Sequence, residues 1–206
     1  LPIDPYLMGY WLGNGSSTDY EITVRDSDVE AVRAQIPYEI KSEVVQPGSH
    51  RLRIPALKAI LVDSFRDKAI PSEYLWASEG QRWALLQGLM DSDGCISREK
   101  SQSVYVSTIR QLAESVRELL WSLGVKNAMT VGPSLRYGEP TGETLYTIRF
   151  TTFDDQPTSR LKRKYDRRRE RTKKTRSCFH YLQDIQPLPY RVKMRCIQVD
   201  SPSHQY

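Results

Sequence analysis

Two short stretches of the sequence end in groups that could hold a metal ion. The stretches 7–15 and 86–94 each run as an apolar helical segment that ends in Asn14 or Asp93 and then glycine. A carboxylate at the C-terminal end of a helix is unfavourable, because the carbonyl end already carries partial negative charge, and Asp91 adds a second acid there. A cation would relieve this repulsion, and carboxylate and carbonyl oxygens are the ligands that Mg²⁺ prefers. Two such ends side by side would suit two-metal phosphodiester hydrolysis, whereas a single Asp-Gly after a helix is an ordinary turn.

Small residues recur at helical spacing within both stretches. Gly9 and Gly13 are four residues apart, as are Gly88 and Ser92, so each pair lies on one helical face. A glycine inside a helix costs about 1 kcal/mol relative to alanine. Its recurrence in both copies favours two helices packed closely along these faces over two helices whose glycines are incidental. The glycine that closes each stretch suits the left-handed conformation that commonly ends a helix.

The two stretches begin two copies of one longer pattern. The first is followed by an alternating strand, a short helix that Ser27 or Asp28 could cap, and two further strands. The second is followed by a hairpin, a helix that Gly124 can end, and two strands around a Gly/Pro-rich loop. The expected strands span 20–26, 38–45, 50–54, 125–131 and 145–151, the hairpin 95–108, the helices 29–36, 56–65 and 110–123, and the loop 132–142. A period of about 80 residues is too long for a solenoid, so the sequence predicts an α+β fold of two pseudo-symmetric αββαββα halves.

The composition describes a basic chain that can form a core. Hydrophobic residues make up 39% of the 206 residues, and no stretch reads as a signal peptide or as a membrane span. Three scattered cysteines form neither a C-x-x-C zinc motif nor a disulfide framework, which favours an intracellular location, in the cytoplasm or nucleoid. The segment 160–176 holds eleven Lys or Arg against two acids, in a chain whose net charge is +5. This segment fits a polyanionic partner or, equally, a solvated helix or tail. Because the first residue is Leu1, the chain is expected to be a fragment of a longer protein.

These residues together resemble one family. The stretch 86–94 is similar to the LAGLIDADG motif of homing endonucleases, and 7–15 is a weaker copy. The runs 68–75 and 81–94 look like the middle of intein-encoded endonucleases, and 194–206 resembles the start of the C-terminal splicing segment of an intein. The resemblance covers most of the chain, and its parts come in the right order.

The resemblance implies a monomer with internal pseudo-twofold symmetry. Its two sheets would form a saddle over double-stranded DNA, with the motif helices as the central seam. It also implies Mg²⁺-dependent cleavage of both strands at a long pseudo-palindromic site, leaving short 3′ overhangs, with Ca²⁺ or Mn²⁺ as substitutes for Mg²⁺. The expected divisions are a first half at 1–80, a second half at 81–185 and a tail at 186–206 that leads into the splicing module.

The resemblance also assigns roles to particular residues. The metal-binding acid of each motif falls at Asp93 and at Asn14, with Gly13 and Ser92 beside them as ligands. Lys68 matches a basic residue near one scissile phosphate; Lys164 is the choice for the other, with Lys162 as the alternate. Asn14 keeps a carbonyl ligand but loses a charge, so the first metal site should be weaker. A natural loss of activity, a nicking enzyme and an engineered change that traps uncut DNA all remain open.

The alternation of the strands predicts which side chains face outward. Thr23 and Arg25 are expected to face away from the core, and so is Tyr105, with Val104 and Val106 facing inward. Outward polar side chains could read the major groove, although a solvated sheet face would be equally polar. The basic segment would contact phosphates, which position a protein without specifying sequence. The residues expected to contact DNA are Thr23, Arg25, Lys41, Arg51, Arg53, Arg98, Tyr105, Arg136, Arg149, Lys162, Arg163 and Arg167.

Three functions therefore compete. The first is an active or attenuated homing endonuclease. The second is a LAGLIDADG domain that binds DNA specifically and either nicks it or leaves it uncut, and Asn14 is its main support. The third is protein splicing, which needs a Cys or Ser at the N-terminus and an Asn at the C-terminus. The sequence runs from Leu1 to Tyr206, so it is not expected to splice alone.

Overall fold

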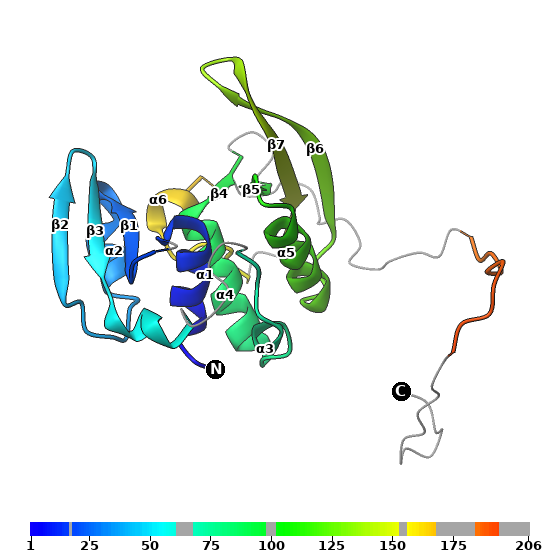
Figure 1. Cartoon of the computed structure of the whole chain (residues 1–206), viewed down its shortest axis with the longest axis horizontal. Helices are drawn as coiled ribbons and strands as arrows, with labels where there is room; N and C mark the ends of the chain where they lie inside the picture. The colour runs from blue at the N-terminus through cyan, green and yellow to red at the C-terminus, as the bar shows by residue number, and fades with distance from the viewer. Residues whose placement is uncertain (17, 61–67, 98–101, 153–155, 168–183, 194–206) are drawn as a thin grey trace, which may run out of the picture.

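Two buried helices run side by side between two antiparallel sheets in the computed structural model, which describes residues 1–16, 18–60, 68–97, 102–152, 156–167 and 184–193. Figure 1 shows the sheets flanking this central pair, α1 and α4, on opposite sides. The elements of the first half are α1 (Pro5–Asn14), β1 (Glu21–Arg25), η1 (Asp26–Asp28), α2 (Val29–Arg33), β2 (Ser42–Gln46), β3 (Ser49–Arg53) and η2 (Pro55–Ile60). The remaining elements are α3 (Ser72–Leu75), α4 (Glu79–Ser92), β4 (Gly94–Ile96), β5 (Ser103–Ser107), α5 (Arg110–Ser122), β6 (Asn127–Arg136), β7 (Glu139–Phe150) and α6 (Lys162–Tyr165).

The two central helices begin with side-chain caps. The Asp4 carboxylate accepts from the Leu7 amide at 3.0 Å, and a proline at the first helical position follows it. Ser78 and Gln81 form a capping box at the start of α4. Local sequence signals therefore determine where both helices begin.

Glycines let the backbones of α1 and α4 touch. A Cβ atom on Gly9 would lie 2.1 Å from the Leu85 carbonyl oxygen, and one on Gly88 would lie 2.1 Å from the Tyr6 carbonyl oxygen. Real Cβ atoms do not come that close to backbone atoms, so only glycine fits at either position. The predicted close packing of the two repeated helices is confirmed.

The two sheets share one topology. The second sheet has the order β4-β5-β7-β6, and the first has the order β1-β3-β2. An isolated bridge from Gly15 to Ile22 in the first half stands where Gly94 pairs with Tyr105 in the second. The first half thus repeats the second with its leading strand reduced to that bridge. Of the two strands that the αββαββα pattern places before α2, the described residues form only β1, which matches the strand expected at 20–26. The prediction of two halves with antiparallel sheets is confirmed.

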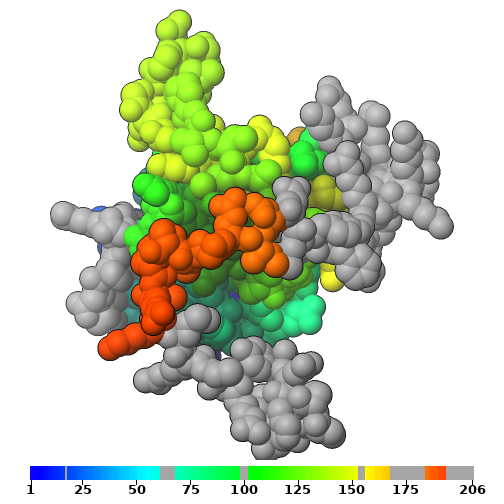
Figure 2. Space-filling view, turned by 90° about the vertical axis from the view of Figure 1, so that its right-hand side faces the viewer, coloured from blue at the N-terminus to red at the C-terminus, as the bar shows by residue number. Residues whose placement is uncertain are grey.

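The long hairpin β6–β7 corrects the sequence analysis. Its strands extend through most of 132–142, the stretch expected to be a loop, and reverse at Tyr137 (φ 54°) and Gly138 (φ 90°). Positive φ at both central residues is the turn geometry that matches the twist of paired strands. Pro133 is tolerated because β6 lies at the edge of the sheet, next to a register shift. Figure 2 shows the hairpin standing clear of the body of the protein.

Two further expectations differ from the structure in part. The helix expected at 56–65 is a 3-10 segment as far as Ile60, and 61–67 lie outside the described residues. The part of the tail at 184–193 is exposed and has no regular element, and 194–206, which carries the intein-like run, also lies outside the described residues.

Strand β5 faces the opposite way from the prediction. Tyr105 is 0% exposed, whereas Val104 and Val106 are only partly buried on the outer face. Tyr105 pairs across the sheet with Ile148, which is also in the core. The expected alternation holds in β1, where Ile22 and Val24 are buried and the residues between and after them are exposed.

Candidate active site

The C-terminal ends of α1 and α4 meet where the two helices touch. A Cβ atom on Gly13 would lie 2.1 Å from the Ser92 hydroxyl oxygen and 2.8 Å from a carboxylate oxygen of Asp93. Asn14 and Asp93 are both partly buried. Gly15 is extended, with φ −86°, and Gly94 begins β4, so neither adopts the expected left-handed conformation. Gly15 is needed for space instead, because a Cβ there would lie 2.1 Å from the Trp11 ring.

Lys68 occupies the end of α1. Its ammonium donates to the Gly15 carbonyl at 2.8 Å and to the Trp11 carbonyl at 3.2 Å, and lies 4.9 Å from the centre of the Trp11 ring. Burial lowers the pKa of Lys68 below its usual value, and the nearby Asp93 carboxylate opposes that shift. An ammonium has three N–H donors, so Lys68 keeps one beyond its two carbonyl acceptors in the described part of the chain.

Lys164 occupies the end of α4 in the same way, but more deeply. Its ammonium lies 2.8 Å from each of the Met90, Asp91 and Gly94 carbonyl oxygens and 3.3 Å from that of Ser92. Only 5% of Lys164 is exposed, and burial lowers its pKa to about 8. The alternate, Lys162, is exposed and pairs with Asp166 at 2.6 Å. The two lysines thus offset the partial negative charge of the carbonyl ends, the charge that a metal ion is expected to relieve from sequence alone.

Asp93 is close enough to both ammonium groups to be affected by their charge. Burial raises the pKa of its carboxyl group, and Lys68 and Lys164 both oppose that rise. Lys68 belongs to the first half and Lys164 to the second, so both halves contribute to the electrostatics of this one carboxylate. The residue is also the C-cap of α4.

Asn14 is the uncharged counterpart of Asp93. Burial raises the pKa of the Tyr10 phenol, and a side-chain hydrogen bond with Asn14 offsets part of the rise. An amide at this place keeps an oxygen ligand but adds no negative charge. The end of α1 is therefore less attractive to a cation than the end of α4.

The oxygen atoms at the helix ends fit a divalent cation in kind, but they are few. Asp93 offers a carboxylate, Asn14 an amide oxygen, and Gly13 and Ser92 backbone carbonyls, all of them hard ligands that suit Mg²⁺. Among the residues that the structure describes, no group of three or more His, Cys, Asp or Glu is placed to hold a metal. The residues fit a cation whose coordination is completed from outside the protein, for instance by phosphate oxygens. A cation would also offset the burial of Asp93.

Asp91 does not belong to this set of ligands. It is 2% exposed and accepts hydrogen bonds from the Tyr6 hydroxyl at 2.9 Å, from the Arg160 amide at 3.0 Å and from the Ser159 hydroxyl. Burial raises the pKa of its carboxyl group, and these donors oppose the rise. From its position alone Asp91 is only an added charge at the helix end, because its structural role depends on donors about 70 or more residues away in sequence.

The residues expected to contact DNA separate into three groups. Most are exposed, but Tyr105 is in the core, and the Arg163 guanidinium is held by the carboxylate of Asp28. Tyr105 therefore corrects the prediction, because a buried ring cannot reach a ligand. Arg163 is exposed, but its guanidinium is already paired with a buried acid. Arg98 lies outside the described residues, as do 168–176 of the basic segment, and Arg167 is partly buried. The exposed residues are Thr23, Arg25, Lys41, Arg51, Arg53, Arg136, Arg149, Lys162 and the paired Arg163.

Comparisons with known proteins find one family and several relatives. Residues 80–156 match a family model described as a LAGLIDADG-like domain. The chain is 32% identical, over 99% of its length, to a protein named replicative DNA helicase DnaB from Mycobacterium intracellulare, and it spans 33% of that relative's length. A structure described as I-DmoI in complex with DNA and Mn is 16% identical, with a TM-score of 0.49, over 73% of this chain and 89% of that one. A structure of mesophilic variants of the homing endonuclease I-DmoI is also 16% identical, with a TM-score of 0.48, over 73% and 88%. In the part of the chain that the structure describes, no helix is long and apolar enough to cross a membrane.

Proposed function

We propose that this chain, in which residues 80–156 match the LAGLIDADG-like family model, is a site-specific double-strand DNA endonuclease of the homing type whose two halves cut unequally. The observation that carries this proposal is the pair of adjoining helix ends, each with a buried or partly buried lysine and only one with a carboxylate. Two such ends could act on the two strands of one duplex, and the end with Asp93 would act faster.

The residues of the site have distinct roles in this proposal. Asp93, Asn14, Gly13 and Ser92 would hold Mg²⁺, or Mn²⁺ or Ca²⁺ in its place, and the bound ion would activate water and stabilise the leaving oxygen. Lys68 has an N–H donor left for a phosphate oxygen, and it stabilises the negative charge that develops there. Lys164 has more carbonyl acceptors than donors. It therefore acts through its charge on Asp93 and on the bound phosphate, without donating to either.

The outer faces of the two sheets are the proposed DNA-binding surface. In the first sheet Thr23, Arg25, Arg51 and Arg53 are exposed on one face. In the second, Arg149 is exposed on the face that also carries Thr130 and donates to its hydroxyl at 2.8 Å. Arginine reads guanine in the major groove, and threonine contacts the thymine methyl. Lys41, Arg136, Lys162 and Arg167 are proposed to contact phosphates, which makes affinity salt-dependent.

We further propose that the chain is an inserted segment of a larger protein related to replicative helicases. Its relative has that name, and the chain spans only a third of it. An endonuclease domain carried by an intein would have this relation to its host. The proposed divisions are 1–80 and 81–185 for the two halves and 186–206 for the passage into a splicing module. The proposed location is the cytoplasm or nucleoid, where chromosomal DNA is accessible.

A plasmid assay tests the proposal. The substrate is a supercoiled plasmid that carries the helicase coding sequence without the inserted segment, and the control plasmid carries the same sequence interrupted by it. With Mg²⁺ we expect the first plasmid to accumulate open circles and then linear product, and the control and a chelator-treated sample to stay supercoiled. A gel shift on the first plasmid without any cut would favour the alternative, a DNA-binding domain that does not cleave, for which Asn14 is the support. If the protein neither shifts nor cuts the first plasmid, the proposal is contradicted.

A further inference from the structure

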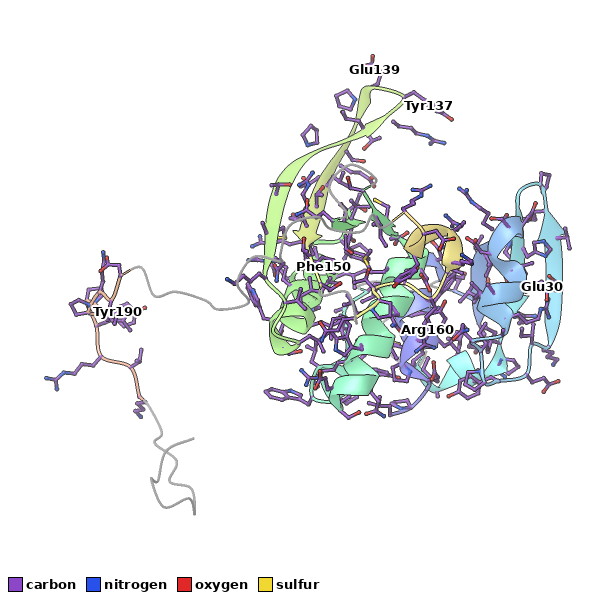
Figure 3. The ribbon with its side chains drawn as sticks, turned by 180° about the vertical axis from the view of Figure 1, so that it is seen from behind. Glu30, Tyr137, Glu139, Phe150, Arg160 and Tyr190 are labelled. Carbon is purple, nitrogen blue, oxygen red and sulfur yellow. The ribbon has the colours of Figure 1, made fainter. Side chains whose placement is uncertain are left out.

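The segment 157–167, here named the strap, runs from the second half onto the first. Near its start, the Pro157 carbonyl accepts from the Gln87 side chain at 2.9 Å, and the Arg160 guanidinium donates back to Gln87 at 2.7 Å. Ser159 and the Arg160 amide bind Asp91 of α4. Figure 3 shows Arg160 between the two halves, beside the central helices. These contacts attach the strap to the helix whose end forms the candidate site.

Two arginines of the strap then reach the first half. Arg160 donates to the Gln35 side chain, just after α2, at 2.9 Å. Arg163 donates through two nitrogens to both carboxylate oxygens of Asp28. Asp28 is 4% exposed and lies 135 residues away in sequence. A buried carboxylate held by a bidentate guanidinium has a well-defined geometry, and losing either partner leaves the other charge unpaired.

The Asp28 contact determines the orientation of the short helix that carries Lys164. Helix α6 has four residues, and a helix this short is oriented by its tertiary contacts and not by its own stability. Leu161, 2% exposed, anchors the strap in the core just before α6. Neighbouring residues on a helix point about 100° apart, so fixing Arg163 against Asp28 also fixes the direction of Lys164.

We propose that Asp28 is a positioning residue: through Arg163 it holds the Lys164 ammonium over the carbonyl end of α4, so the first half controls the site in the second. The predicted effect of Asp28 on cleavage rests on the function proposed above, whereas its predicted effect on the position of the Lys164 ammonium does not. Without the Asp28 contact, α6 can rotate, and the Lys164 ammonium can leave the four carbonyls for solvent.

Lysine labelling tests the placement directly, without DNA. The intact protein is treated with an amine-acylating reagent, and the extent of modification at each lysine is measured by mass spectrometry. In the original protein Lys164 should react slowly. Lys162 should react quickly, because the Lys162 side chain is 85% exposed. In Asp28→Asn the reactivity of Lys164 should approach that of Lys162, while Lys162 stays unchanged. The matched control is Arg33→Gln, which breaks the exposed ion pair from α2 to Glu43 at 2.9 Å and should leave Lys164 protected.

A second variant covers the case in which Asp28→Asn does not fold. Arg163→Lys keeps the charge but loses the bidentate contact, and it too should expose Lys164. If Lys164 stays protected in the folded variants, the inference is overturned, because the lysine then holds its place without Asp28.

Strand-resolved cleavage tests the consequence for the site. In single-turnover reactions Asp28→Asn should slow cleavage of the DNA strand that the Asp93 end of α4 acts on. The expected slowing is about 10- to 100-fold, the loss typical when a group of the site moves by about 1 Å. The Kd for DNA should change by less than about twofold. A parallel loss of binding and cleavage would show a general structural role and overturn the inference. If the original protein cuts neither strand, the proposed function fails, and the labelling result still decides the role of Asp28.

Discussion

The two helix ends at the centre of the molecule have the same packing and different charge. At the end of α1, Asn14 is neutral and Lys68 makes two hydrogen bonds to carbonyls. At the end of α4, Asp93 is an acid and Lys164 is surrounded by four carbonyls and buried. The backbones touch at the matching glycines Gly9 and Gly88, and Gly13 at the end of α1 packs against Ser92 of α4. The helix packing that brings the two ends together is therefore independent of the charged and polar side chains that would bind a metal ion or phosphate at each end.

The outer faces of the two sheets differ as well. In the first sheet arginines dominate, and two acids lie near them, with Arg51 at 3.9 Å from Glu21 and Arg53 at 3.8 Å from both Glu21 and Asp19. In the second sheet the register places Val104 and Val106 beside Arg149 and Thr147. One face is suited to hydrogen-bond acceptors on guanine, and the other to methyl groups.

Replacing Asp93, the acid that distinguishes the end of α4 from the end of α1, should have the largest effect on the cleavage rate. Asp93→Asn makes the two helix ends alike, and we expect cleavage to fall about 1000-fold, the equivalent of about 4 kcal/mol of lost transition-state stabilisation. Single-turnover rates on a labelled duplex measure it. DNA binding measured by gel shift should persist. If the variant cuts as fast as the original protein, Asp93 is not the acid of the site.

Replacing a contact glycine tests whether the two ends share their packing. Gly88→Ala places a Cβ against the Tyr6 carbonyl, and we expect a loss of about 1–3 kcal/mol in the free energy of unfolding. Gly80 is in the same helix with nothing within 4 Å of its would-be Cβ, so Gly80→Ala should instead stabilise by about 0.5–1 kcal/mol. Urea denaturation compares the two. Equal effects would contradict the close approach of α1 and α4.

The burial of the two lysines predicts how stability depends on pH. The pKa of Lys164 is about 8 when folded, whereas an unfolded lysine has a pKa of about 10.4. Below pH 8 both states carry the proton and the cost of burying the charge is present in full. Above it the folded state loses the proton first, so the unfolded state binds more protons and stability rises with pH. We expect about 1–2 kcal/mol between pH 8 and pH 9.5, measured by urea denaturation. Lys164→Met should remove more of this slope than Lys68→Met, and an equal loss would contradict the deeper burial of Lys164.

Substitutions on the outer faces of the two sheets should have smaller effects, each on the base preference in a different half of the DNA site. Arg51→Ala should cost about 1 kcal/mol and relax a guanine preference in one half-site. Thr147→Ser, which deletes a methyl group, should relax a thymine preference in the other half. Selection of bound duplexes from a randomised library measures both. If Arg51→Ala weakens binding equally at every sequence, that arginine contacts phosphate and not a base.

Much of this arrangement could be predicted from local patterns, and the rest depends on distant partners. The two motif stretches, their contact glycines and Lys68 follow from residue type and spacing. The predicted orientation of β5 is wrong because Ser103–Ser107 alternates valine with tyrosine, and both sets of side chains are apolar enough for a core. Only the outer part of the β6–β7 hairpin, 132–142, differs from its predicted loop, because glycine and proline mark turns as well as an edge strand. The ion pair of Asp28 with Arg163 joins residues 135 positions apart, and nothing local predicts it.

The most direct test of unequal halves is strand-resolved cleavage by Asn14→Asp. On a duplex labelled on both strands, the original protein should cut one strand faster than the other. The variant should speed the slow strand by at least about tenfold and leave the fast strand unchanged, because only the end of α1 gains a charge. If Asn14→Asp changes both strands equally, or neither, the difference between the two helix ends does not control cleavage.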